Sequence, residues 1–104
     1  MGTILKPQDS DRLSFSSKVV PETRISDWIA KSLSEFGVKR VHGLMGGGAA
    51  GLNDGFISSP DIDYICYHHE QSAGHSAIGE AKYSVRLAVV NPTTGCGGTN
   101  CITS

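Results

Sequence analysis

The chain has 104 residues and a formal net charge of -1, with 9 Lys and Arg residues against 10 Asp and Glu residues. The charges form no blocks, which argues against a nucleic-acid or membrane partner and favours a small molecule or another protein. No apolar run approaches the about 18 residues of a membrane span, and no signal peptide is recognisable. We therefore expect a cytoplasmic protein with one modest core.

Residues 1–20 show neither helical nor strand periodicity, and we predict that they form a mobile leader before a domain over residues 21–104. An amphipathic helix follows, because apolar side chains recur at i, i+3, i+4, i+8 and i+11 from Ile25 to Phe36. This apolar stripe, which includes Trp28, is expected to face the core. Gly37 is expected to end the helix.

Short apolar segments and helices then alternate along the chain. Residues 38–45, 62–67 and 87–90 are predicted strands. Three glycines at 46–48 turn the chain into a short helix after the first strand, and a helix of small residues follows the second. This alternation predicts an α/β fold with three layers, in which helices cover both faces of a parallel sheet and the crossovers are right-handed.

The cysteines and two histidines have structural interpretations. Cys66, Cys96 and Cys101 are an odd number and lack the spacing of a metal site, and Cys66 lies in an apolar strand pattern. We expect buried thiols in a reducing compartment and no metal site in this chain. His42, within a strand, is expected to be a hydrogen-bonded core residue, and His75 to be structural.

A glycine-rich pattern offers one functional hypothesis. Residues 46–51 (GGGAAG) satisfy G-x-G-x-x-G after a strand, and Glu70 lies at about the distance expected of a ribose-binding acid. Adjacent glycines satisfy this pattern easily. A module without catalytic activity that binds a nucleotide of the NAD type remains an alternative, as does an inactive truncated product.

A second hypothesis starts from the corner that follows the second strand, where Glu70 begins a helix in the sequence HHEQSAGHSAIGEAK. Ligands of open α/β sheets bind outside the carboxyl ends of the strands, which makes this acid a candidate for chemistry. The stretch resembles the segment HEQAAAHAAxGYAR of thiamine-diphosphate enzymes of the acetolactate synthase and 2-oxoacid decarboxylase type. In those enzymes the segment belongs to the N-terminal pyrimidine-binding domain.

Two further segments carry the same resemblance. Residues 43–47 (GLMGG) match the Gly-Val-Pro-Gly-Gly turn of the family, and residues 93–100 (TTGCGGTN) look like its Thr-Ser-Gly-Pro-Gly-Ala-Thr-Asn. Together the three motifs cover about residues 24–104. Five residues differ from the usual Pro, Pro, Asp, Tyr and Arg of the family, namely Met45, Cys96, Ile78, Glu80 and Lys82.

The resemblance implies thiamine-diphosphate binding and, in the full-length protein, carboligation or decarboxylation of pyruvate or another 2-oxoacid. Glu70 is then the catalytic residue, because the matching glutamate bonds N1′ of the aminopyrimidine and favours the tautomer whose N4′ takes the C2 proton. Cofactor-binding residues implied besides Glu70 are Gly46, Gly47, Thr94, Gly95 and Gly97. Those implied for substrate contact or proton transfer are His69, Met45 and Cys96.

The resemblance also implies parts that this chain lacks. The family binds the diphosphate and Mg2+ through a Gly-Asp-Gly motif in a C-terminal domain, and this sequence contains no Gly-Asp-Gly. Residues 21–104 are then the N-terminal part of a pyrimidine-binding domain, inactive alone. The family holds its cofactor between subunits, which implies a homodimer or tetramer of the full-length protein. FAD binding stays undetermined.

Overall fold

The structure, a computed structural model, describes residues 23–104, and the leader predicted for residues 1–20 lies outside this range. A 3-10 helix is labelled η, as distinct from an α-helix. The elements in chain order are α2 (Ile25–Glu35), β1 (Arg40–Gly43), η2 (Gly47–Ala49), α3 (Ala50–Ser58), β2 (Asp63–Cys66), α4 (Glu70–Ser84), β3 (Val89–Asn91), α5 (Cys96–Asn100) and η3 (Cys101–Thr103).

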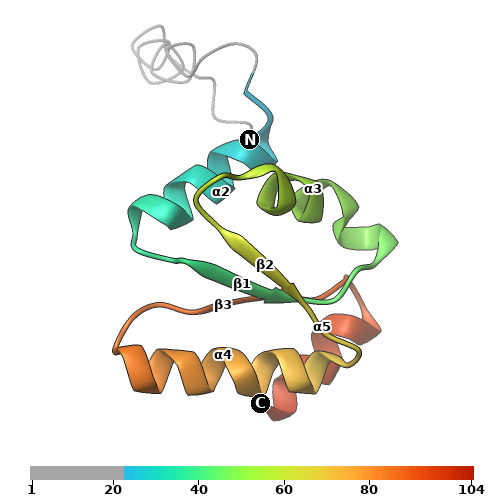
Figure 1. The fold of residues 1–104 in the computed structure, drawn as a ribbon. Coiled ribbons are helices and arrows are strands. Elements are labelled where there is room, and N and C mark those ends of the chain that lie inside the picture. The colour runs from blue at the N-terminus through green and yellow to red at the C-terminus, as the bar shows by residue number, and fades with distance from the viewer. Residues whose placement is uncertain (1–22) are drawn as a thin grey trace, which may run out of the picture.

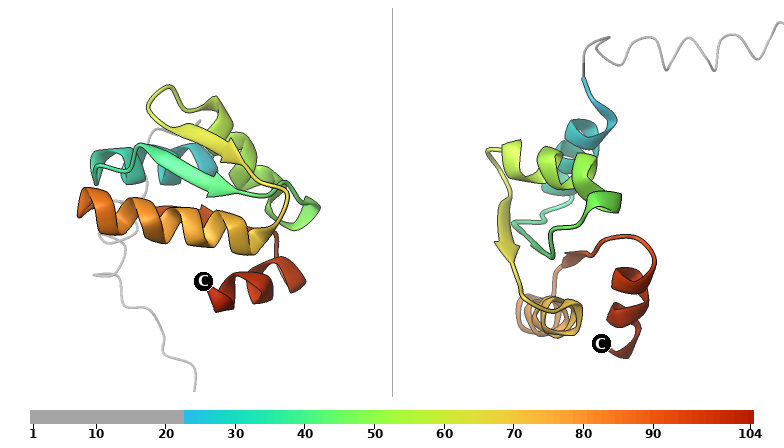
Figure 2. Two further views of the ribbon diagram at one scale, coloured as in Figure 1. Left: turned by 60° about the horizontal axis from the view of Figure 1, so that its bottom comes forward. Right: turned by 90° about the vertical axis from the view of Figure 1, so that its right-hand side faces the viewer.

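The strands form one parallel sheet in the order β2-β1-β3. Gly43 at the end of β1 is aligned with Cys66 of β2 and with Asn91 of β3, so the carboxyl ends of all three strands meet at one edge. Helices α2 and α3 cover one face of the sheet, and α4 covers the other with α5 beside it (Figure 1, Figure 2). The predicted three-layer α/β fold is confirmed.

The hydrophobic core lies between the sheet and the layer of α2 and α3. Its buried members come from both layers and from the segments that precede β1 and β2, and they are Ala30, Val38, Val41, Phe56 and Ile62. Phe56 is the largest fully buried side chain. Burying a side chain of this size contributes about 1.5–3 kcal/mol to folding.

The helix predicted from Ile25 is confirmed, but the expectation that its whole apolar stripe faces the core is wrong. Ala30 is the only buried residue of α2, while Trp28 is 52% exposed and Phe36 is 78% exposed. Helix α2 packs against α3, and this contact covers a narrow line of side chains around Ala30. The flanks of the stripe, including Trp28, therefore stay exposed.

The prediction of buried thiols is also wrong for two of the three cysteines. Cys66 and Cys96 are exposed, Cys101 is half-buried, and all three are free. Cys66 is the last residue of β2, which is an edge strand, so no further strand covers its outer side. Within residues 23–104, no helix is both long enough and apolar enough to cross a membrane.

Helix α4 begins and ends with identifiable local interactions. At its start, the side chain of His69 caps the helix by accepting a hydrogen bond from the backbone N–H of Gln71. At its end, Val85 adopts the left-handed conformation with φ 54°. Small residues on one side, Ala73 and Ala77 among them, are buried and let α4 lie close to its neighbours.

Candidate functional site

The three segments that carry the sequence resemblance meet at the carboxyl edge of the sheet. The glycine turn, residues 46–48, follows β1, the corner with Glu70 follows β2, and the loop of residues 92–95 follows β3. Because the strands are parallel and aligned at their last residues, these loops leave the sheet side by side. This edge is where open α/β sheets bind their ligands.

The glycine turn and the loop after β3 are in direct contact. A Cβ atom at Gly46 would overlap the side chain of Thr93, and one at Gly48 would overlap the hydroxyl of Thr94. Glycine is therefore needed at both positions for the two backbones to approach. At Gly47, by contrast, a Cβ atom would meet nothing within 4 Å, so this part of the turn faces open space.

Glu70 is the first residue of α4 and is only 8% exposed. Its Oε2 accepts a hydrogen bond of 3.1 Å from Nδ2 of Asn100. Its Oε1 faces Gly97, where a Cβ atom would lie 3.3 Å away. One carboxylate oxygen is thus held by α5. A Cβ atom at Gly97 would also lie 2.7 Å from Cγ2 of Thr93, so the missing side chain at Gly97 lets Thr93 pack close to the carboxylate.

Hydrogen bonding decides the charge state of this carboxyl group. The pKa of Glu70 lies below its ordinary value, because the carboxylate accepts hydrogen bonds from its own backbone N–H and from Asn100. Burial acts in the opposite direction but has the smaller effect. The ligand-free chain therefore holds Glu70 as a carboxylate, and any proton that it shares with a ligand has to arrive with that ligand or from solvent.

The charge of Glu70 also affects a neighbouring thiol. Sγ of Cys101 lies 3.6 Å from the backbone oxygen of Glu70 and donates to it. Burial, followed by the negative charge of Glu70, raises the pKa of Cys101. This thiol is therefore held in its neutral form beside the candidate site.

The remaining candidates from the sequence fall into two groups around Thr93. Met45, Gly46 and Gly47 line an open cavity of about 380 Å3 that Glu70 does not line. Gly97 lies with Glu70 instead, and Thr93 contacts the positions of both Gly46 and Gly97. Three further candidates are exposed, Thr94 and Gly95 on the loop after β3 and Cys96 at the start of α5. His69 is engaged as the helix cap through Nδ1.

Sequence reasoning missed Asn53, which lines the same cavity and is 3% exposed. Its Oδ1 accepts hydrogen bonds from the hydroxyl of Tyr64 at 2.9 Å and from Nδ2 of Asn91 at 2.6 Å. Its Nδ2 has no hydrogen-bond partner among residues 23–104. The sequence offered one signal for this residue. Asn53 is a polar side chain between Leu52 and Phe56, on a short helix whose apolar side chains are expected to face the sheet.

Comparison with known proteins decides the family. The N-terminal TPP binding domain of the thiamine pyrophosphate enzymes matches residues 23–104. The chain belongs to this family. It is 36% identical over 75 residues to the acetolactate synthase large subunit of Mycobacterium tuberculosis, covering 72% of this chain and 12% of that protein.

Two other relatives give the same picture. Acetolactate synthase isozyme 3 large subunit of Escherichia coli is 37% identical over 78 residues, covering 75% of this chain and 14% of that protein. The acetolactate synthase large subunit of Lactococcus lactis is 37% identical over 86 residues, covering 83% of this chain and 15% of that protein. The chain therefore spans a small part of the length of these thiamine pyrophosphate enzymes.

The residues present fit the pyrimidine end of thiamine diphosphate. A buried carboxylate begins α4 at the carboxyl edge of the sheet, and the backbone at Gly47 faces open space and carries no side chain that would keep a flat ring away. The unpartnered Nδ2 of Asn53 adds a donor at the neighbouring cavity. Residues 23–104 contain no group of three or more His, Cys, Asp or Glu side chains that could hold a metal ion.

Proposed function

We propose that this chain is the aminopyrimidine-binding part of an acetolactate-synthase-like enzyme, a carboligase or decarboxylase that acts on pyruvate or another 2-oxoacid. The observation that supports this most directly is the geometry of Glu70. It is buried at the start of α4, Asn100 holds one of its oxygens, and the other lies toward the backbone of Gly97. This is the arrangement that a carboxyl group needs to meet a ring nitrogen in a site shielded from water.

When bound, thiamine diphosphate supplies a carbon nucleophile for chemistry on the 2-oxoacid. Glu70 would share a proton with a ring nitrogen of the bound pyrimidine, while Asn100 keeps Oε2 occupied and so fixes the plane of the carboxyl group. Because the pKa of Glu70 is lowered, the resting group accepts rather than donates this proton. The backbone at Gly47 faces open space and lets the ring approach, while Gly46 and Gly97 let Thr93 pack beside the cofactor site.

The flanking residues act on the substrate side of the site. His69 uses Nδ1 to cap α4, which leaves Nε2 as the nitrogen for proton transfer. Met45 and Cys96 are exposed and border the site, where they shape the space for the 2-oxoacid. Thr94 and Gly95, exposed on the loop after β3, would line the wall of the cofactor site.

The whole protein extends this proposal beyond the residues described. Mg2+ and the diphosphate bind to a separate C-terminal domain, and the cofactor lies between subunits of a cytoplasmic homodimer or tetramer. These 104 residues alone then bind the pyrimidine without turnover. We assign no residue to FAD.

The proposal is tested on the 104-residue chain with 4-amino-5-hydroxymethyl-2-methylpyrimidine, the ring of the cofactor without its diphosphate. A titration followed by 1H–15N NMR should shift the resonances of Glu70, Gly97 and Asn100. Glu70→Gln should weaken binding roughly tenfold or more, because a charge-assisted hydrogen bond becomes a neutral one. Glu35→Gln, at the exposed end of α2, is the matched control and should bind as the wild type does.

Two outcomes would overturn the proposal. The first is a titration in which the pyrimidine shifts no resonance at the carboxyl edge, or binds equally well to Glu70→Gln. The second is a parallel titration in which NAD, and not the pyrimidine, shifts the glycines of residues 46–51. That result would establish the alternative of a nucleotide-binding module.

A further inference from the structure

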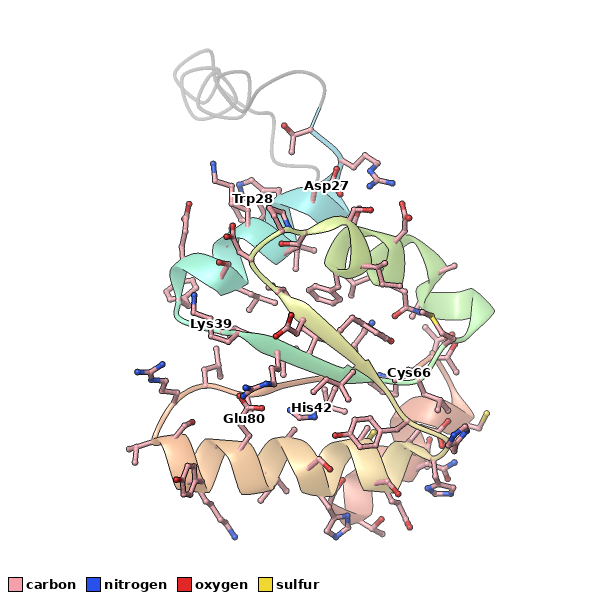
Figure 3. All side chains as sticks on the ribbon, viewed as in Figure 1. Asp27, Trp28, Lys39, His42, Cys66 and Glu80 are labelled. Carbon is pink, nitrogen blue, oxygen red and sulfur yellow. The ribbon has the colours of Figure 1, made fainter. Side chains whose placement is uncertain are left out.

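His42 is the centre of a partly buried hydrogen-bonded network that joins the central strand to the segment before Glu70 and to the C-terminal half of α4. Its Nε2 lies 2.7 Å from Oε2 of Glu80, and its Nδ1 lies 2.9 Å from the hydroxyl of Tyr67. The histidine is 4% exposed. Figure 3 shows its side chain pointing from β1 toward α4, where Glu80 points back toward the sheet.

The proton arrangement of this network follows from its two ends. An ionised Glu80 can only accept, so Nε2–H of His42 donates to it. In the neutral ring Nδ1 then accepts from the hydroxyl of Tyr67, and in the protonated ring Nδ1–H donates to the same oxygen. Both hydrogen bonds form in either protonation state of His42. The network is therefore a fixed link between β1, the segment before α4, and α4 itself.

The partly buried carboxylate of Glu80 requires a hydrogen-bonding partner, and His42 is that partner. The family resemblance leads one to expect tyrosine at this position, so the carboxylate is a feature of this chain. Its side chain is 21% exposed, and a carboxylate so far removed from water is costly unless it is paired. His42 provides that pairing on the buried side, and Arg40, at 3.3 Å, provides it on the exposed side.

The link reaches the chain immediately before the candidate catalytic residue. Tyr67 precedes Glu70 by three residues, and its backbone N–H donates to the oxygen of Gly43 at 2.9 Å. Tyr67 is thus held to β1 twice, by its backbone and by its hydroxyl. Glu80 holds the C-terminal half of α4 to the same strand, so His42 ties both the segment before Glu70 and the helix that Glu70 begins to one rigid element.

We propose that His42 is a positioning residue, which fixes the orientation of the Glu70 carboxyl group through Tyr67 and Glu80. This inference deepens the proposed function. Only the expected effect on ligand binding rests on that function; the effect on the orientation of Glu70 does not. The position of Glu70 has its own reporter in the ligand-free chain. That reporter is the side-chain amide of Asn100, which donates to Oε2 of Glu70.

The decisive variant is Tyr67→Phe, which removes one hydroxyl and leaves the pair of His42 and Glu80 intact. We expect the side-chain NH2 resonances of Asn100 to move and the affinity for the aminopyrimidine to fall about 2- to 10-fold, as for the loss of one hydrogen bond. Glu80→Gln keeps an acceptor for Nε2–H of His42. This variant should retain the Asn100 resonances and the aminopyrimidine affinity of the wild type. Arg40→Gln removes only the exposed ion pair and is the matched control.

His42→Phe should show the larger effect, since it removes both contacts, and if it does not fold, Tyr67→Phe alone decides. A Tyr67→Phe chain that melts earlier but keeps the Asn100 resonances and the affinity of the wild type would overturn the inference, because the link would then be merely structural. If Glu70→Gln also leaves the affinity unchanged, the proposed function fails. The Asn100 resonances still test the positioning.

Discussion

Alanine at two glycines of α3 should change the stability of the chain in opposite directions. Helix α3 lies against α2 at Gly55, where a Cβ atom would lie 2.6 Å from Cβ of Ser26 and 2.7 Å from its carbonyl carbon. At Gly51, one turn earlier, a Cβ atom would have nothing within 4 Å. The two positions therefore share a helix and differ in what surrounds them.

The comparison isolates the cost of the helix contact. Both substitutions gain helix propensity of about 1 kcal/mol, so this gain cancels between them. Overpacking a tight contact costs about 1–3 kcal/mol, and the backbone of Ser26 cannot rotate out of the way as a side chain can. We expect Gly51→Ala to raise the free energy of unfolding by roughly 0.5–1 kcal/mol. Gly55→Ala should end about 1–3 kcal/mol below Gly51→Ala.

Urea unfolding followed by circular dichroism measures this difference, provided that the three chains show the same slope with denaturant. Thermal unfolding gives a second measurement, in which each kcal/mol shifts Tm by about 4–8 °C for a domain of this size. If both alanines stabilise the chain equally, α2 does not pack on α3 at Gly55. The layer above the sheet would then be arranged differently.

Three further predictions concern the site and its helix. Because the pKa of Glu70 is lowered from 4.5 in the folded chain, its charge stabilises the fold above that pH and the contribution is lost on acidification. Glu70→Gln should therefore flatten the acid side of a plot of stability against pH, and an unchanged acid limb would contradict this. Val85→Gly should raise stability by up to about 1 kcal/mol in thermal melting, since a β-branched residue at φ 54° is strained and this one is 89% exposed; no gain would mean no strain. Iodoacetamide, followed by mass spectrometry, should modify the exposed Cys66 and Cys96 before Cys101, whose pKa is raised by burial, and the reverse order would refute the placement of α5.

The fold could be predicted from the sequence because its signals are local. Apolar periodicity identifies α2, and the alternation of strands with helices implies parallel pairing. Exposure could not be predicted in the same way. Whether Trp28 is covered depends on how α3 lies beside α2, and whether Cys66 is covered depends on β2 being an edge strand. Both are properties of contacts between segments far apart in the chain.

In the candidate site, too, contiguous motifs could be recognised from the sequence, whereas contacts between distant segments could not. Glu70 and the glycine turn were recognised from contiguous motifs, and the structure brings them to one edge of the sheet. Asn100 and Thr93 lie inside a recognised motif, yet their contacts with Glu70 and Gly97 cannot be read from it. His42 and Glu80 are separated by 38 residues, so only the packing of α4 on β1 brings them together.

Polar groups are buried on both faces of the sheet at the carboxyl end of β1. On the α3 face, Tyr64 crosses over Gly43 to reach Asn53, and a Cβ atom at Gly43 would overlap its hydroxyl. On the α4 face, His42 links Tyr67 and Glu80.

The opposite end of the core, around Val38 and Ile62, is apolar. Apolar residues of similar volume would usually stabilise a fold at least as well as such buried polar networks. Among residues 23–104, the buried polar side chains His42, Asn53, Glu70 and Asn91 lie at or near the end of the sheet that carries Glu70, and we therefore expect them to serve the geometry of the candidate site more than the stability of the fold.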